Sequence, residues 1–223
     1  MNDSIELTGA DGFAFSAYLA KPTGEIKGRV VVIQEIFGVN DHIREVCDGY
    51  AEEGYIALAP ALFDRVAPGI ELGYEGDDMA QGVEIAMGTL EMPNTLSDVQ
   101  AAIDYLAKDG KVGVVGYCFG GLLTWLSAAD ANNIACASGY YGGGIAQSIE
   151  KAPKVPTILH FGDLDAHIPI PDVKSIDEAH PEVMVYTYDA DHGFNCDHRG
   201  SYNESAAALA RQRTLGFFEQ YLG

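Results

Sequence analysis

The chain has 223 residues, of which 33 are acidic and 13 are basic, giving a formal net charge of -20. A surface of that charge repels nucleic acid and anionic membranes, so we expect neither as a partner. The sequence contains no run of about 18 uncharged apolar residues, which is the length needed to span a bilayer. The acidic N-terminus also lacks the basic start of a signal peptide. We therefore expect a cytoplasmic protein without a membrane span.

Strands and helices are predicted to alternate along most of the chain. A hairpin comes first, with residues 13–20 as an edge strand, and the β-branched run at 29–33 is typical of a strand buried on both faces. Apolar side chains at helical spacing mark residues 95–108 as a helix. The predicted strands are residues 4–8, 13–20, 29–33, 55–59, 111–115, 134–138, 157–161 and 183–188. The predicted helices are residues 41–53, 95–108, 120–129, 172–179 and 201–222.

This alternation indicates an α/β fold: a mostly parallel sheet of about seven or eight strands with helices on both faces. No repeat, linker or low-complexity tract divides the chain, so we expect one domain over residues 1–223. Residues 64–94 are less regular, rich in glycine and acidic groups, and are expected to form a cap or loop near a site.

The last helix is expected to begin at Ser201, where S-Y-N-E has the form of a capping box. Its apolar side chains are then available for the core. These are Leu209, Phe217, Phe218 and Tyr221.

The most informative stretch is G-Y-C-F-G at residues 116–120, between a predicted strand and a predicted helix. It has the form of the nucleophile elbow of α/β-hydrolases, with Cys118 where serine is usual. The turn is strained, and the glycines at both ends give it room. The N-terminus of the helix favours a thiolate at Cys118, and the N–H of Phe119 can face a developing oxyanion. A structural cysteine in a tight turn is the alternative.

Two later segments supply the partners that such a nucleophile needs. Asp165 follows the strand at 157–161 and His192 follows the strand at 183–188, so the chain order is nucleophile, acid, histidine. All three follow the carboxyl ends of strands, where α/β sheets bind ligands. His160 lies inside a strand and is expected in the core or as a group that supports the site from behind, and His167 is at most a residue of the site's mouth. No pair of residues has convincing metal-ligand spacing, so we expect no metal.

The segment Q-E-I-F-G at 34–38 follows the buried strand at 29–33. In this fold the second oxyanion N–H comes from here, and Ile36 is the candidate. Glu35 has two interpretations. Its carboxylate could hold Cys118 as a neutral thiol through repulsion or proton sharing, or it could accept hydrogen bonds from the backbone of a turn.

Together these motifs resemble the dienelactone hydrolase (carboxymethylenebutenolidase) family. The resemblance extends over nearly the whole chain, in order. The matching segments are Q-E-I-F-G at 34–38, A-P-A-L-F at 59–63, G-Y-C-F-G-G at 116–121, Y-Y-G-G-G at 140–144, G-D-L-D-A-H-I-P at 162–169 and D-H-G-F at 191–194.

The resemblance implies a triad of Cys118, His192 and Asp165, with Asp163 as a weaker alternative acid. It also implies that Glu35 gates the cysteine. The oxyanion donors carry over to the backbone of Ile36 and Phe119.

The best-known members of the family also hold a substrate carboxylate with two arginines. In this sequence the matching places are Ala80 and Cys196. The resemblance therefore implies hydrolysis of an ester or lactone and leaves the particular substrate open.

The predicted function is a cysteine-dependent hydrolase of a small carboxylic ester or lactone, forming a thioester intermediate without a cofactor, in a monomer or small homo-oligomer. A thioesterase or acyl transferase would use similar chemistry. The substrate-binding candidates are Phe37, Arg65, Tyr140, Tyr141, Phe194 and Arg199, for which core packing of the aromatics and surface ion pairs of the arginines are the alternatives. One rival is a thiol redox protein in which Cys118 pairs with Cys47, Cys136 or Cys196, and another is a ligand-binding hydrolase fold without catalysis.

Overall fold

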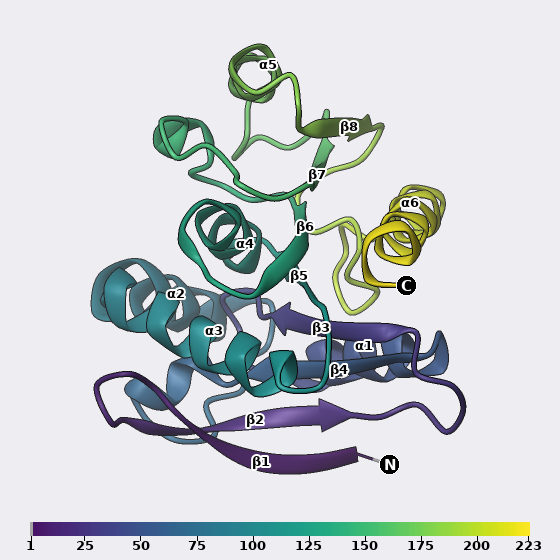
Figure 1. Cartoon of the computed structure of the whole chain (residues 1–223). Coiled ribbons are helices and arrows are strands. Elements are labelled where there is room, and N and C mark those ends of the chain that lie inside the picture. The colour runs from purple at the N-terminus through teal and green to yellow at the C-terminus, as the bar shows by residue number, and fades with distance from the viewer. Residues whose placement is uncertain (1) are drawn as a thin grey trace.

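The structure, a computed structural model, describes residues 2–223 and contains a single eight-stranded sheet (Figure 1). The strands are β1 (Asn2–Thr8), β2 (Ala14–Ala20), β3 (Gly28–Ile33), β4 (Tyr55–Pro60), β5 (Val112–Tyr117), β6 (Ile134–Tyr140), β7 (Thr157–Gly162) and β8 (Met184–Tyr188). Their order across the sheet is β1-β2-β4-β3-β5-β6-β7-β8. The pairs β1–β2 and β2–β4 are antiparallel and the others are parallel. This confirms the predicted mostly parallel sheet.

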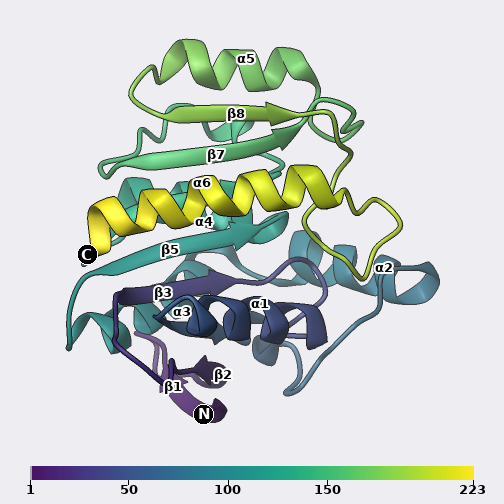
Figure 2. The same ribbon diagram turned by 90° about the vertical axis from the view of Figure 1, so that its right-hand side faces the viewer.

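Helices cover both faces of the sheet, with α1 and α6 on one side and α3 and α4 on the other (Figures 1 and 2). The helices are α1 (Asp41–Glu52), α2 (Gly76–Glu84), α3 (Met92–Ala107), α4 (Phe119–Asp130), α5 (Ile170–Ala179) and α6 (Glu204–Leu222). Short 3-10 turns are η1 (Leu62–Arg65) and η3 (Ala146–Ser148), and a π-helical turn, η2 (Ile85–Thr89), extends α2. Among residues 2–223, no helix is both long enough and apolar enough to cross a membrane.

The β-branched run of β3 explains why it lies inside the sheet. Val30 and Val32 belong to the core that contains α1 and α6, whereas Val31 and Ile33 belong to the core that contains α3. Successive side chains of a strand point to opposite faces, so a continuous apolar run fits only a strand covered on both sides.

Three expectations about local structure are wrong. The edge strand of the hairpin is β1, because β2 also pairs with β4. The last helix begins at Glu204 and not at Ser201, since the side chain of Asn203 accepts a hydrogen bond from the Ala206 N–H (3.1 Å) and caps it. Leu209 is 41% exposed, because it lies on the outer face of α6.

The irregular segment at 64–94 contains η1, α2 and η2 and packs against the loop that follows β3. A Cβ at Gly82 of α2 would clash with the carbonyl oxygen of Ile36. This close approach places α2 directly over the Q-E-I-F-G segment.

Candidate active site

Cys118 occupies a sharp turn between β5 and α4, with φ 55° and ψ -113°. A non-glycine residue at positive φ is strained, and the surrounding structure must hold it there. A Cβ at Gly116 would meet the carbonyl of Gly120, and a Cβ at Gly120 would meet the carbonyl of Ile33 at the end of β3. Glycine is therefore required at both positions so that the turn can close against the neighbouring strand.

His192 lies within hydrogen-bonding distance of both other residues of the predicted triad. His192 Nε2 is 3.1 Å from Cys118 Sγ, and His192 Nδ1 is 2.6 Å from Asp165 Oδ2. Asp165 Oδ1 accepts hydrogen bonds from the N–H groups of His167 (2.8 Å) and Ile168 (3.3 Å). The acid is thus fixed by its own turn, and the histidine is fixed between acid and thiol. The parallel strands β5, β7 and β8 all end on the same side of the sheet (Figure 2), and Cys118, Asp165 and His192 follow those three ends in the chain.

The charges of this group are coupled. Burial disfavours a charged His192, but its hydrogen bonds with Asp165 and Cys118 outweigh burial and raise the pKa of the imidazole to about 10. Burial opposes charge on Asp165 as well, and its hydrogen bond with His192 still lowers the pKa of the carboxyl below its ordinary value. The charged forms of His192 and Asp165 stabilise each other, so the arrangement favours an imidazolium paired with a carboxylate beside the Cys118 sulfur.

The loop after β3 lies beside the elbow because β3 and β5 are neighbours in the sheet. The Gln34 side chain, fully buried, accepts a hydrogen bond from the Leu62 N–H (3.1 Å) and donates one to the Glu35 carbonyl (3.2 Å). Ile36 follows in this loop, and Phe119 begins α4 directly after Cys118. The sequence motif includes Gln34, but nothing in the sequence indicates that it anchors the loop.

The carboxylate of Glu35 is 1% exposed and faces Arg199. Among the described residues its one hydrogen bond joins Oε1 to Arg199 Nη1 at 3.4 Å, and Oε2 has no partner. Neither the thiol of Cys118 nor a backbone N–H accounts for the position of Glu35. The guanidinium lies 5.6 Å from the ring centre of Phe37 and 5.8 Å from that of Tyr74, which supports it through cation–π contacts.

The remaining substrate-binding candidates differ in how close they lie to the triad. The Tyr141 ring lies 5.2 Å from that of His192, in an edge-to-face contact. Phe194 is fully buried, and Tyr140 lies in the core, where its hydroxyl is 2.7 Å from that of Thr214. Arg65 is bound elsewhere. Its guanidinium pairs with Asp98 (2.6 Å) and Asp11 (2.9 Å) and lies over the Phe13 ring.

Two further side chains lie next to Glu35: His42, which no sequence motif indicates, and Cys196, which the sequence places only where the family has an arginine. His42 and Cys196 each place a potential ligand atom within 4.8 Å of the Glu35 carboxylate. His42 lies in the first turn of α1 and Cys196 in the loop after β8. Since 154 residues separate them and no motif joins them, only the tertiary structure reveals their proximity.

The other cysteines are free and buried, unlike the half-buried Cys118. Burial raises the pKa of the Cys47 thiol far above its ordinary value and raises those of Cys136 and Cys196 to about 12. His160 is fully buried within β7, which confirms the prediction of a core histidine.

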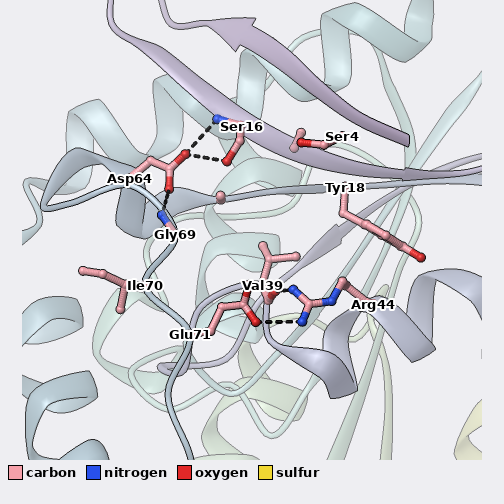
Figure 3. A pocket seen from close by; sticks show the side chains of 11 residues that line it. Ser4, Ser16, Tyr18, Val39, Arg44, Asp64, Gly69, Ile70 and Glu71 are labelled. Carbon is pink, nitrogen blue, oxygen red and sulfur yellow. Dashed lines mark hydrogen bonds and ion pairs between the residues drawn. The ribbon is translucent and has the colours of Figure 1, made fainter. Parts of the chain in front are cut away.

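A hollow of about 250 Å³ lies apart from this group, beside β2, η1 and the loop before α2 (Figure 3). Its two least exposed charged side chains, Asp64 and Arg44, are already paired. Asp64 accepts hydrogen bonds from the N–H and hydroxyl of Ser16 and from the Gly69 N–H. Arg44 binds the Val39 carbonyl and the Glu71 carboxylate. These bonds hold the segment at 64–71 against β2, so we assign the residues around the hollow a structural role.

Comparisons with known proteins agree with the fold and show the family. The model of the dienelactone hydrolase family matches residues 15–222. A carboxymethylenebutenolidase of Pseudomonas putida is 35% identical over 97% of this chain and 96% of its own. A Synechocystis protein, named as a candidate carboxymethylenebutenolidase, is 40% identical over 93% of this chain and 92% of its own.

Among solved structures, a candidate dienelactone hydrolase from Klebsiella pneumoniae has a TM-score of 0.86 at 29% identity, covering 99% of this chain and 100% of that one. Since the family model spans nearly the whole chain and its relatives align over 93–97% of it, the chain belongs to the dienelactone hydrolase family and is a carboxylic ester hydrolase with the α/β-hydrolase fold.

Proposed function

We propose that the protein hydrolyses a small carboxylic ester or lactone with Cys118 as the nucleophile. The observation that carries this proposal is the continuous line of contacts from Cys118 Sγ to His192 Nε2 (3.1 Å) and from His192 Nδ1 to Asp165 Oδ2 (2.6 Å). A nucleophile within reach of a base that is itself oriented by a third group is the arrangement that covalent acyl transfer requires.

In the proposed reaction the Cys118 thiolate attacks the carbonyl carbon of the substrate. The backbone N–H groups of Ile36 and Phe119 hold the developing oxyanion, and each such donor lowers a barrier by about 3 kcal/mol. The His192 imidazolium then protonates the leaving oxygen, and the acyl group stays on sulfur as a thioester. Neutral His192 next takes a proton from water, which attacks the thioester and releases the acid.

We assign Glu35 to control of the thiol. In the described arrangement Arg199 holds its carboxylate and Cys118 faces His192, which supports a released state ready to react. When Glu35 turns from Arg199 toward the sulfur, like-charge repulsion would favour the neutral thiol.

Phe37 and Tyr141 contact Arg199 and His192, so they are the aromatic candidates expected to border the bound substrate. Arg199 is the candidate for an anionic group of the substrate, provided that the group competes with Glu35 for the guanidinium. Relatives named carboxymethylenebutenolidase support a lactone as the first compound to test.

Two features of the other cysteines support hydrolysis over the thiol redox alternative. Cys47, Cys136 and Cys196 are all fully buried, and burial raises the pKa of each thiol. A resolving thiol must be accessible and ionisable.

The test is a screen of lactones, aryl esters and thioesters with the wild-type chain and with Cys118→Ala. The variant should lose at least a thousandfold in kcat/KM while keeping the wild-type unfolding temperature. Intact-protein mass spectrometry after rapid quenching should find an acyl adduct on the peptide that contains Cys118. Turnover by Cys118→Ala at the wild-type rate, or consumption of peroxide in place of esters, would overturn the proposal.

A further inference from the structure

A second group of chemically capable side chains lies outside the Cys118 site, where α1 meets the segment before α6. His42, Glu45, Asp197 and His198 each offer one ligand atom, and these atoms all lie within 4.8 Å of one another. His198 Nε2 is 2.7 Å from Glu45 Oε2, and His42 Nδ1 is 3.3 Å from Asp197 Oδ1. Figure 2 shows the chain before α6 descending toward the start of α1. This approach brings Asp197 and His198 to His42 and Glu45.

His42 is the unusual member of this group. It is 3% exposed, and neither ring nitrogen has a hydrogen-bond partner among the described residues. Buried polar groups in native proteins nearly always have a partner. Nδ1 lies 3.3 Å from the Asp197 carboxylate but does not form a hydrogen bond with it. The ring therefore presents to the cluster a nitrogen whose lone pair or proton has no partner, as a metal ligand must.

We propose that His42, Glu45, Asp197 and His198 bind a divalent transition-metal ion, with Zn²⁺ as the best match. Imidazole nitrogens and carboxylate oxygens are ordinary zinc ligands. Two carboxylates and two neutral imidazoles supply a charge of -2, which balances the ion.

The geometry needs only a modest contraction of the cluster. Bonds of about 2.1 Å in a tetrahedron separate the ligand atoms by about 3.4 Å. The Glu45 and Asp197 side chains are 58% and 59% exposed, so they can close on the fixed His42 ring.

An ion can reach the cluster from solvent. A groove of about 370 Å³ is lined by His42, Glu45 and Asp197 and extends along α6. The cation that also lines it, Arg211, donates to the Gly49 carbonyl (2.9 Å) and pairs with Glu53, so it does not neutralise the cluster.

His42 also belongs to an inner set with Glu35 and Cys196, and all three of those side chains are buried. We favour the outer set because the groove reaches it and three of its four ligands are partly exposed. Sulfur ligation distinguishes the two sets experimentally, since Cys196 would take part only in the inner one.

The experiment titrates the full chain carrying Cys118→Ala, so that the active-site thiol cannot bind the ion. Calorimetry with Zn²⁺ should give one ion per chain, and Zn²⁺ should raise the unfolding temperature because it binds only the folded state. His198→Ala and Glu45→Gln should each weaken binding at least tenfold. Glu52→Gln, an exposed change on the same helix, should bind as tightly as the parent.

Co²⁺ supplies a second readout that does not depend on folding energy. The proposed site should give the visible bands of a tetrahedral ion and no sulfur-to-cobalt charge-transfer band. A sulfur-to-cobalt band would assign the ion to Cys196 and overturn the proposal. The absence of saturable binding would also overturn it, as would binding by His198→Ala and Glu45→Gln that is as tight as in the parent.

Discussion

Glu35 and Arg199 form an ion pair that is withdrawn from solvent, with Oε1 3.4 Å from Nη1 and side-chain exposures of 1% and 16%. The burial of Arg199 opposes its charge, and the Glu35 carboxylate outweighs this and raises the pKa of the guanidinium. The two residues lie 164 positions apart in the chain. Their pairing links the loop after β3 to the segment that follows His192.

Removing one partner of this ion pair should lower the free energy of unfolding. Arg199→Met leaves the Glu35 carboxylate buried without a partner, and we expect a loss of roughly 3 kcal/mol in unfolding free energy. The double variant Glu35→Gln/Arg199→Met should recover much of that loss, because no unpaired charge remains. Urea unfolding of the wild type, the two single variants and the double variant completes a double-mutant cycle. Equal stabilities of Arg199→Met and the double variant would contradict this view of the pair.

Asp165, and not Asp163, should orient the histidine. Asp165→Asn removes the anion that holds Nδ1–H of His192, and we expect kcat/KM for an aryl ester to fall about 10⁴-fold. Asp163→Asn is the matched control, since that side chain is exposed and lies two residues away. It should keep activity within a few-fold of wild type, and a greater loss in Asp163→Asn than in Asp165→Asn would exchange their roles.

The glycine after the elbow should tolerate no side chain. Gly120→Ala places a Cβ against the Ile33 and Gln34 carbonyls, where backbone cannot yield. We expect a loss of about 3 kcal/mol or more, at the upper end of overpacking costs. Gly216→Ala in α6 meets nothing within 4 Å and should stabilise the chain by up to about 1 kcal/mol. Thermal unfolding compares the two, and a stable Gly120→Ala would refute the steric argument.

His160 should weaken the fold in acid. Burial, assisted by Arg213, lowers the pKa of its imidazole to about 3, whereas the unfolded chain protonates it near 6.5. Between these values the unfolded state binds more protons, so stability falls as the pH falls, by up to about 1.4 kcal/mol per pH unit. His160→Gln should flatten the stability profile between pH 6 and 4 and leave its slope above pH 7 unchanged. An unaltered acid slope in His160→Gln would contradict this assignment.

Much of the fold could be predicted because its signals are local. The run at 29–33 indicates a strand covered on both faces, and β3 has both cores around it. The errors have two different causes. Whether β2 is an edge strand depends on its pairing with β4, which lies beyond α1 in the chain. The start of α6 is a local choice, because Ser201 and Asn203 are both possible caps and only the structure shows that Asn203 reaches the Ala206 N–H.

The sequence by itself determined the order of Cys118, Asp165 and His192 and the glycines around the elbow, since these follow from strand ends and from steric limits within a few residues. The tertiary structure decided the rest. It paired Arg199 with Glu35 and Arg65 with Asp98. It also placed His42 and Glu45 beside Asp197 and His198. Pairings between side chains on separate loops depend on how those loops pack, and one-dimensional spacing does not contain that information.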